Sequence, residues 1–168
     1  TGEGYVYGIQ VKGGEYNQVL KNLFNNITSY ELKNQIYIRG DKPYGIIDEE
    51  NWGEQYPYVD KFWDEIDYRR ESRNTLVKGN VLTKGNGHHC RDQEEKDTTY
   101  DSNLSLDCEK VSFNLLRTQD GRESGTYLTK NKVINSGQQN VLIHDDYKNV
   151  IINADNVFPG IVEDRGIN

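Results

Sequence analysis

The chain has 168 residues, of which 20 are basic and 27 acidic, so the net charge is −7 and the length suits one domain. Leu, Ile, Val and Phe make up 40 of the 168 residues, which allows a core that also uses many of the 12 tyrosines. Apolar runs reach only three or four residues, so the composition excludes a membrane helix. We likewise expect no solenoid, no coiled coil and no chain-wide attraction to nucleic acid.

The first part of the chain predicts a strand, a helix and a hairpin. Residues 5–11 are β-branched and aromatic and are followed by two glycines, which is typical of a strand that ends there. Between residues 15 and 27 the apolar side chains recur at helical spacing, which predicts an amphipathic helix. Residues 35–47 contain two apolar runs around a turn with Gly and Pro, which predicts a hairpin.

A second helix is predicted to begin at Pro57, a favoured first helical residue, and arginines near its end suit the helix dipole. Residues 75–82 then read as one strand or two, with Gly79 as a bend. No aliphatic side chain occurs from 84 to 103, which predicts a long polar loop.

The rest of the chain predicts antiparallel strands. Hairpins are expected at 111–133 and 140–153, and the tail from about 155 has few apolar residues to hold it. We find no internal repeat and no linker, so residues 1–168 are expected to form a single domain. The resulting fold class is α+β, a mostly antiparallel sheet with two helices in the first half.

Two features favour a secreted protein. Cys90 and Cys108 are the only cysteines, and one disulfide between them would consume both. Asn26 and Asn103 each begin an N-glycosylation acceptor sequence, although a chain with 18 asparagines produces such sequences by chance. The alternative is a cytosolic protein with two buried thiols.

Acid–base catalysis is one hypothesis for function. His144 follows an apolar run and precedes two aspartates, where a histidine could transfer protons. Its partner would be His89 or a glutamate such as Glu109 or Glu123, and Arg117 or Arg122 could bind a phosphate. A helix on an antiparallel sheet with a late histidine is similar in outline to small microbial ribonucleases, a likeness of outline without a shared motif. Nucleic acid would be a partner only under this hypothesis.

Adjacent histidines in a polar loop do not make a metal site, because the usual ligand spacing is missing, and no cofactor motif is complete. The most informative surplus is aromatic: Trp52, Tyr56, Tyr58 and Trp63 lie among acidic residues, and such rings are preferred anchors in interfaces. The first prediction is therefore a secreted, disulfide-containing binding or effector module that recognises a protein with a basic surface or a glycan. A small secreted hydrolase or toxin that uses His144 is the alternative.

Overall fold

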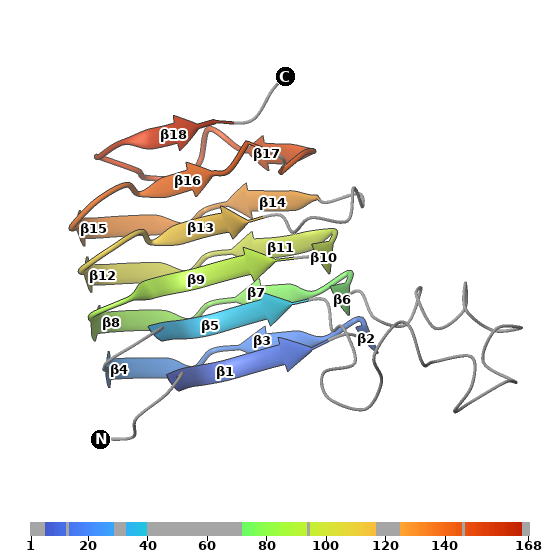
Figure 1. Cartoon of the computed structure of the whole chain (residues 1–168), viewed down its shortest axis with the longest axis horizontal. Coiled ribbons are helices and arrows are strands. Elements are labelled where there is room, and N and C mark those ends of the chain that lie inside the picture. Colours follow the sequence, from blue (N-terminus) through green and yellow to red (C-terminus); the bar gives the residue numbers. More distant parts are fainter. Residues whose placement is uncertain are drawn as a thin grey trace, which may run out of the picture.

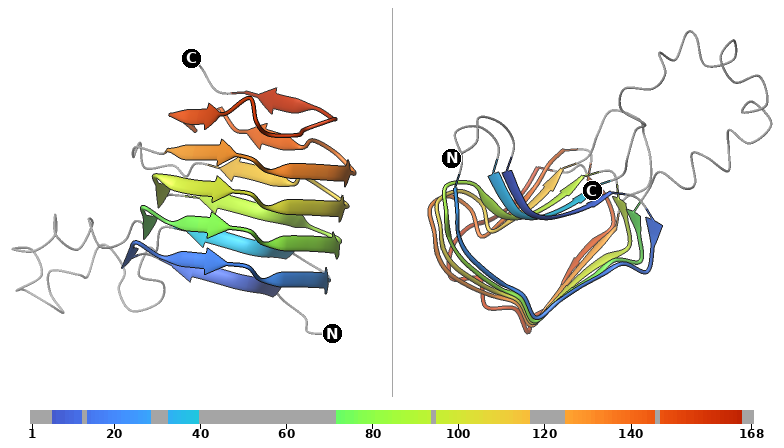
Figure 2. Two further views of the ribbon diagram at one scale, coloured as in Figure 1. Left: turned by 180° about the vertical axis from the view of Figure 1, so that it is seen from behind. Right: turned by 90° about the horizontal axis from the view of Figure 1, so that it is seen from below.

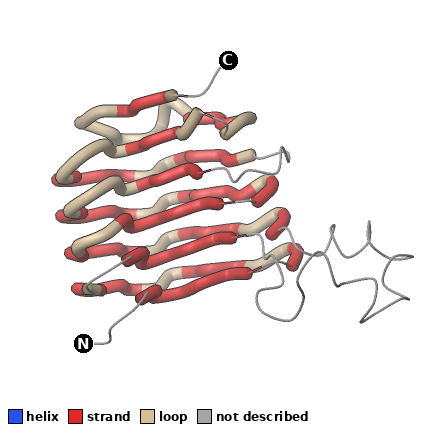
Figure 3. The backbone as a smooth tube through the Cα atoms, viewed as in Figure 1, coloured by secondary structure: helices blue, strands red, loops and turns tan. Residues whose placement is uncertain are grey.

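The structure is a computed structural model that describes residues 6–12, 14–28, 33–39, 72–93, 95–116, 125–145 and 147–165. This part of the chain contains 18 β-strands and no helix (Figure 3). Every pairing between these strands is parallel. The predicted α+β class with a mostly antiparallel sheet is therefore wrong.

The described strands form four parallel sheets. Sheet A has six strands in the order β1 (Val6–Lys12), β5 (Lys33–Arg39), β9 (His88–Gln93), β13 (Phe113–Leu116), β16 (Val141–Ile143) and β18 (Val162–Asp164). Sheet C has the order β3 (Gln18–Leu20), β7 (Leu76–Lys78), β11 (Thr98–Asp101), β14 (Thr126–Thr129) and β17 (Val150–Ile152). Sheet D has the order β4 (Leu23–Ile27), β8 (Val81–Gly85), β12 (Leu104–Cys108) and β15 (Lys132–Ser136). The small sheet B joins β2 (Gly14–Glu15), β6 (Ser72–Arg73) and β10 (Glu95–Lys96).

The chain visits the sheets in turn and then starts again one level higher, so the described residues form a parallel β-helix (Figure 1). Seen along its axis, the sheets are the sides of a tube whose turns lie on top of one another (Figure 2). The expectation that the chain is not a solenoid is therefore wrong. Each turn can bury its inward side chains only against its neighbours, which explains why the core has the form of stacks.

The predicted helix at 15–27 is instead β2, β3 and β4. Val19 and Phe24 point inward and are buried, whereas Leu20 and Leu23 are 41% and 72% exposed. A two-residue turn separates the strands, and Lys21 in it has a φ of 52°. Two short strands joined by such a turn place apolar residues at spacings that resemble a helix. The predicted helix from Pro57 lies outside the described residues.

The stretch expected to be a polar loop, 84–103, contains β9, β10 and β11. Its inward positions are filled by polar or aromatic side chains, among them Asp92 and Tyr100, so aliphatic residues are not needed there. Asp92 accepts hydrogen bonds from the hydroxyls of Tyr100 (2.5 Å) and Thr126 (3.1 Å). A hydrogen-bonded carboxylate can thus occupy a core position.

The expected hairpins are also absent from the described residues. β13 and β14 lie in different sheets, as do β16 and β17, because each segment leads on to the next side of the tube. The tail beyond 155 contributes β18, which pairs with β16, and Val157, which bridges to Lys132. The partner proposed for residues 35–39, at 44–47, lies outside the described residues. The strands predicted at 5–11, 35–39 and 75–82 are confirmed in position.

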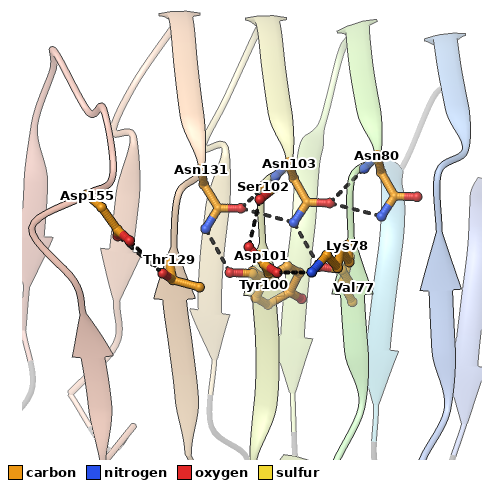
Figure 4. A network of polar contacts seen from close by, with 10 residues as sticks. All are labelled: Val77, Lys78, Asn80, Tyr100, Asp101, Ser102, Asn103, Thr129, Asn131 and Asp155. Atoms are coloured by element: carbon orange, nitrogen blue, oxygen red, sulfur yellow. Dashed lines mark hydrogen bonds and ion pairs between the residues drawn. The ribbon is translucent and has the colours of Figure 1, made fainter.

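Asparagines form a ladder at the turn between sheets C and D (Figure 4). Asn80 Nδ2 donates to Asn103 Oδ1 (2.9 Å), and Asn103 Nδ2 donates to Asn131 Oδ1 (3.0 Å). Asn22 and Asn156 continue the ladder at its two ends with bonds of 3.0 Å. Successive members are 58, 23, 28 and 25 residues apart in sequence, so the ladder marks the period of the fold.

Candidate functional site

The strand register of sheet A places one row of side chains on its outer face. Tyr37, Arg91, Asn114 and Leu142 are successive partners across β5, β9, β13 and β16. Their chain neighbours, such as Ile36 and Ile38, belong to the core cluster, whereas Tyr37 and Leu142 do not. Because side chains alternate along a strand, the row faces away from the interior of the tube. We call these four residues and the groups that contact them the outer-face site.

The guanidinium of Arg91 is held in place within this site. Its Cζ lies 5.2 Å from the centroid of the Tyr37 ring, and its Nη2 donates to Gln93 Oε1 at 3.2 Å. The hydroxyl of Tyr37 also donates to Gln93 Oε1, and the ring of Tyr7 lies 5.1 Å from that of Tyr37. Stacking on an aromatic ring and a bond to a fixed amide orient the charged group.

His144 is positioned at the end of β16. Its backbone N–H donates to Leu115 O (3.0 Å), and its Nε2 lies 3.0 Å from Asn114 Oδ1. A carboxamide oxygen only accepts, so Nε2 carries the proton, and the neutral ring presents Nδ1 as an acceptor. Burial lowers the pKa of His144 below its usual 6.5, and the charge of Arg165 lowers it further. The ring is therefore neutral at pH 7.

His88 lies beside the row, in register with Asn34 on β5. Burial lowers the pKa of His88 to about 4, with further contributions from the positive charges of Arg91 and Lys110 and a weaker one from His144. Its Nδ1 accepts a hydrogen bond from the backbone N–H of Val111 (3.4 Å). A second neutral imidazole thus lies close enough to Arg91 and His144 for their charges to act on it.

His89 does not join His144. It is fully buried inside the tube, where its Nδ1 lies 2.7 Å from Ser105 Oγ, and Ser105 donates to Ser112 Oγ (2.8 Å). Burial lowers the pKa of His89 to about 4. The structure therefore brings His144 together with His88 and Arg91, and not with His89; Arg117, the predicted phosphate ligand, lies outside the described residues.

The predicted disulfide is wrong. Cys90 and Cys108 are both buried free thiols. Cys90 is stacked in the core between Ile36 and Phe113, and burial raises its pKa well above the usual value. Burial also raises the pKa of Cys108 to about 11. Both thiols stay protonated at neutral pH and serve as small apolar side chains.

The two sequon asparagines have different surroundings. Asn26 is exposed, with a φ of 57°. Asn103 is buried in the ladder, and the amide nitrogen that a glycan would need donates to Asn131 Oδ1 and to Val77 O (2.9 Å). Glycosylation stays a prediction at both positions, and the folded ladder leaves the nitrogen of Asn103 already occupied.

The predicted aromatic binding residues lie outside the described part of the chain: Trp52, Tyr56, Tyr58 and Trp63. The sequence reasoning also missed Arg91 and Asn114 as members of a site. Their signal was weak, since only the alternation of outward and inward residues along His88–Gln93 could have shown Arg91 on the outer face.

Among the described residues, no three His, Cys, Asp or Glu side chains gather as metal ligands would. The same part of the chain has no helix with the length and apolar character to cross a membrane. Compared with known protein families, curated proteins and solved structures, the chain finds no match in any of the three.

Proposed function

We propose that the chain binds an extended glycan across the outer face of sheet A. The observation that carries this proposal is the outer-face site itself, in which aromatic, guanidinium, amide and imidazole groups come from successive strands. Parallel strands repeat about every 4.8 Å, so a polymer that runs along the axis of the tube can reach both Arg91 on β9 and His144 after β16, which are partly exposed.

The chemistry of the side chains supports a sugar ligand. Amide and neutral imidazole groups both donate and accept hydrogen bonds, as sugar hydroxyls do, and the partly exposed Gln93 and His144 supply such groups. The guanidinium of Arg91 lies over the ring of Tyr37, and this contact limits the side-chain entropy that Arg91 loses when a ligand binds. These groups are preorganised by bonds to one another.

A glycan suits this face better than a protein partner. Protein interfaces rely on exposed aromatic and apolar anchors, whereas Tyr37 and Leu142 are buried. The groups of the site that a ligand can reach are polar: Arg91, Gln93 and His144, all partly exposed. The most exposed apolar side chain of the described strands, Leu23 (72%), lies on β4 of sheet D. A secreted location remains part of the proposal and is supported by the exposed sequon at Asn26 alone, since the disulfide is absent.

The proposal is tested by titrating the full chain with a panel of neutral and acidic hexasaccharides while recording amide chemical shifts. We expect shifts to concentrate on β5, β9, β13 and β16 and to spare β8 and β12 of sheet D. His144→Ala should weaken binding, whereas Lys132→Ala, on the exposed outer side of β15, should not. Shifts confined to sheets C and D, or no binding at all, would overturn the proposal.

A second candidate, a small hydrolase that uses His144, is supported by one observation. The bond to Asn114 fixes the tautomer of His144, and its lowered pKa keeps Nδ1 able to accept a proton at pH 7. His88 and Arg91 replace His89 and Arg117 as its partners in this version. Turnover of an RNA or oligosaccharide panel that His144→Gln abolishes would favour this candidate; binding without turnover would favour the first.

A further inference from the structure

Within the described part of the chain, Arg91 is an oriented cation without a matching anion. Among the residues that the structure describes, the ion pairs are Lys78 with Asp101 and Arg165 with Glu163, and none involves Arg91. Its Nε is buried without a hydrogen-bond partner in the same part of the chain. Nη2 uses one proton on Gln93, so the edge formed by Nη1 and the second proton of Nη2 can still donate.

The surroundings of Arg91 do not neutralise it either. Both neighbouring imidazoles, His88 and His144, are uncharged at pH 7. Glu163 on β18 is the register partner of Leu142. Its carboxylate already accepts hydrogen bonds from Gln139 Nε2 and from Arg165 Nε, each at 2.6 Å. Among the described residues, Arg91 therefore has no carboxylate bound to its guanidinium, in a chain whose net charge is −7.

We propose that the outer-face site takes a carboxylate-bearing sugar chain, with Arg91 as the ligand of the carboxylate. The inference rests on the proposed function and specifies the class of glycan. An arginine edge and a carboxylate match in geometry and form two parallel hydrogen bonds. The partly exposed amide of Gln93 and imidazole of His144 then remain for the hydroxyls of the same sugar and its neighbours.

A carboxylated glycan fits the charges better than a nucleic acid. Nucleic acids carry a phosphate at every residue and are bound through several cations at once. Here a single oriented arginine lies on the face of an acidic chain. Of the other described cations near it, Arg165 is paired with Glu163, and Lys110 is partly exposed. One strong anion contact accompanied by polar contacts suits a uronic acid within a sugar chain.

The test compares hexagalacturonate with its carboxyl-reduced, neutral counterpart by calorimetric titration at pH 7 and low salt. We expect the acidic hexamer to bind at least tenfold more tightly, and 0.5 M NaCl to remove most of that difference. Arg91→Gln should weaken binding of the acidic hexamer roughly 10- to 100-fold, as expected for a charge-assisted hydrogen bond. Arg91→Lys should restore only part of the lost affinity, because an ammonium group cannot form two parallel hydrogen bonds with one carboxylate.

Lys132→Gln is the matched control, since it removes one positive charge from an exposed position on sheet D and should leave the affinity unchanged. Unfolding curves show whether each variant is folded. The comparison of acidic and neutral hexamers uses the unaltered chain, so its result does not depend on the folding of any variant. Equal affinity for the two hexamers would overturn the carboxylate inference and leave glycan binding standing. If neither hexamer binds, the carboxylate inference is overturned, and the lack of any sugar binding removes the proposed function as well. If hexa-adenylate alone binds, and its binding depends on Arg91, the carboxylate inference is also overturned.

Discussion

Asn103 shows how a single side chain ties neighbouring turns of the tube together. Its Nδ2 donates to Val77 O in the turn before and to Asn131 Oδ1 in the turn after, while its Oδ1 accepts from Asn80. Asn103→Ala leaves these buried groups without partners, and each costs about 1–3 kcal/mol. We expect the free energy of unfolding in urea, followed by tyrosine fluorescence, to fall by about 3 kcal/mol.

The matched control is Asn25→Ala. Asn25 is exposed and accepts one hydrogen bond from Thr83 Oγ1 (2.9 Å), so its loss should cost less than about 0.5 kcal/mol. Similar losses for Asn25→Ala and Asn103→Ala would mean that the ladder is not a special source of stability.

His89 predicts a loss of stability in mild acid. Its pKa is lowered from 6.5 to about 4 by burial, so the unfolded chain binds a proton more readily than the folded one between these two values. The contribution of the neutral ring is complete above pH 6.5 and is lost as the pH falls to about 4, by on the order of 3 kcal/mol. Urea unfolding across this range should show the decline.

His89→Gln provides the comparison for this titration, because glutamine can still bond to Ser105 and does not titrate. The variant should depend less steeply on pH than the natural chain, with the remaining slope coming from groups such as His88. Parallel pH profiles for the two proteins would show that His89 takes up its proton without unfolding the chain.

At the scale of elements, the turn between sheets C and D begins with a residue of positive φ at several levels: 52° at Lys21, 66° at Gly79, 56° at Ser102 and 52° at Lys130. A residue with a side chain is strained there, and glycine is not. Lys130→Gly should therefore raise the free energy of unfolding by about 0.5–1 kcal/mol, measured by urea unfolding.

Lys132→Gly is the opposite test, two residues later. Lys132 is exposed in the extended strand β15, where glycine loses chain entropy and should lower stability by about 0.5–1 kcal/mol. Equal signs for the two substitutions would contradict an origin in backbone conformation.

Elements were predictable from sequence where alternation and β-branching carry the signal. The strands at 5–11 and 35–39 have that signal and were found. The stretch 84–103 lacks it, because its inward side chains, such as His89 and Asp92, are polar and form hydrogen bonds with hydroxyl groups inside the tube. Ser105 and Tyr100 lie on other sides of the tube, 16 and 8 residues away in sequence, so the sequence next to His89 and Asp92 could not show them. The helix at 15–27 failed because a two-residue turn imitated helical spacing.

At the scale of the whole molecule, the missed signal was a repeat. An asparagine followed by an aliphatic residue recurs at Asn22, Asn80, Asn103 and Asn156, and at Asn131 the following residue is a lysine. The abundance of asparagine was interpreted only as a source of chance sequons. The 58 residues that separate Asn22 from Asn80 make the period hard to detect, because the other ladder members are 23 to 28 residues apart. The outer-face site depends on this period too, since Arg91 and Asn114 meet only once the turns are stacked in register.

The stacked architecture makes a last prediction about the whole molecule, because each turn is supported only by its neighbours. Amides of the central turns, such as Cys90 N–H bonded to Ser112 O (2.8 Å), have turns on both sides. Amides near the ends, such as Arg165 N–H bonded to Ile143 O (2.9 Å) and Lys21 N–H bonded to Lys78 O (2.9 Å), have a described turn on one side only. Local opening at the ends should let Arg165 and Lys21 exchange more than about tenfold faster than Cys90 after correction for intrinsic rates. Hydrogen exchange followed by NMR at pH 7 measures this, and uniform protection from end to end would mean that the tube opens only as a single cooperative unit.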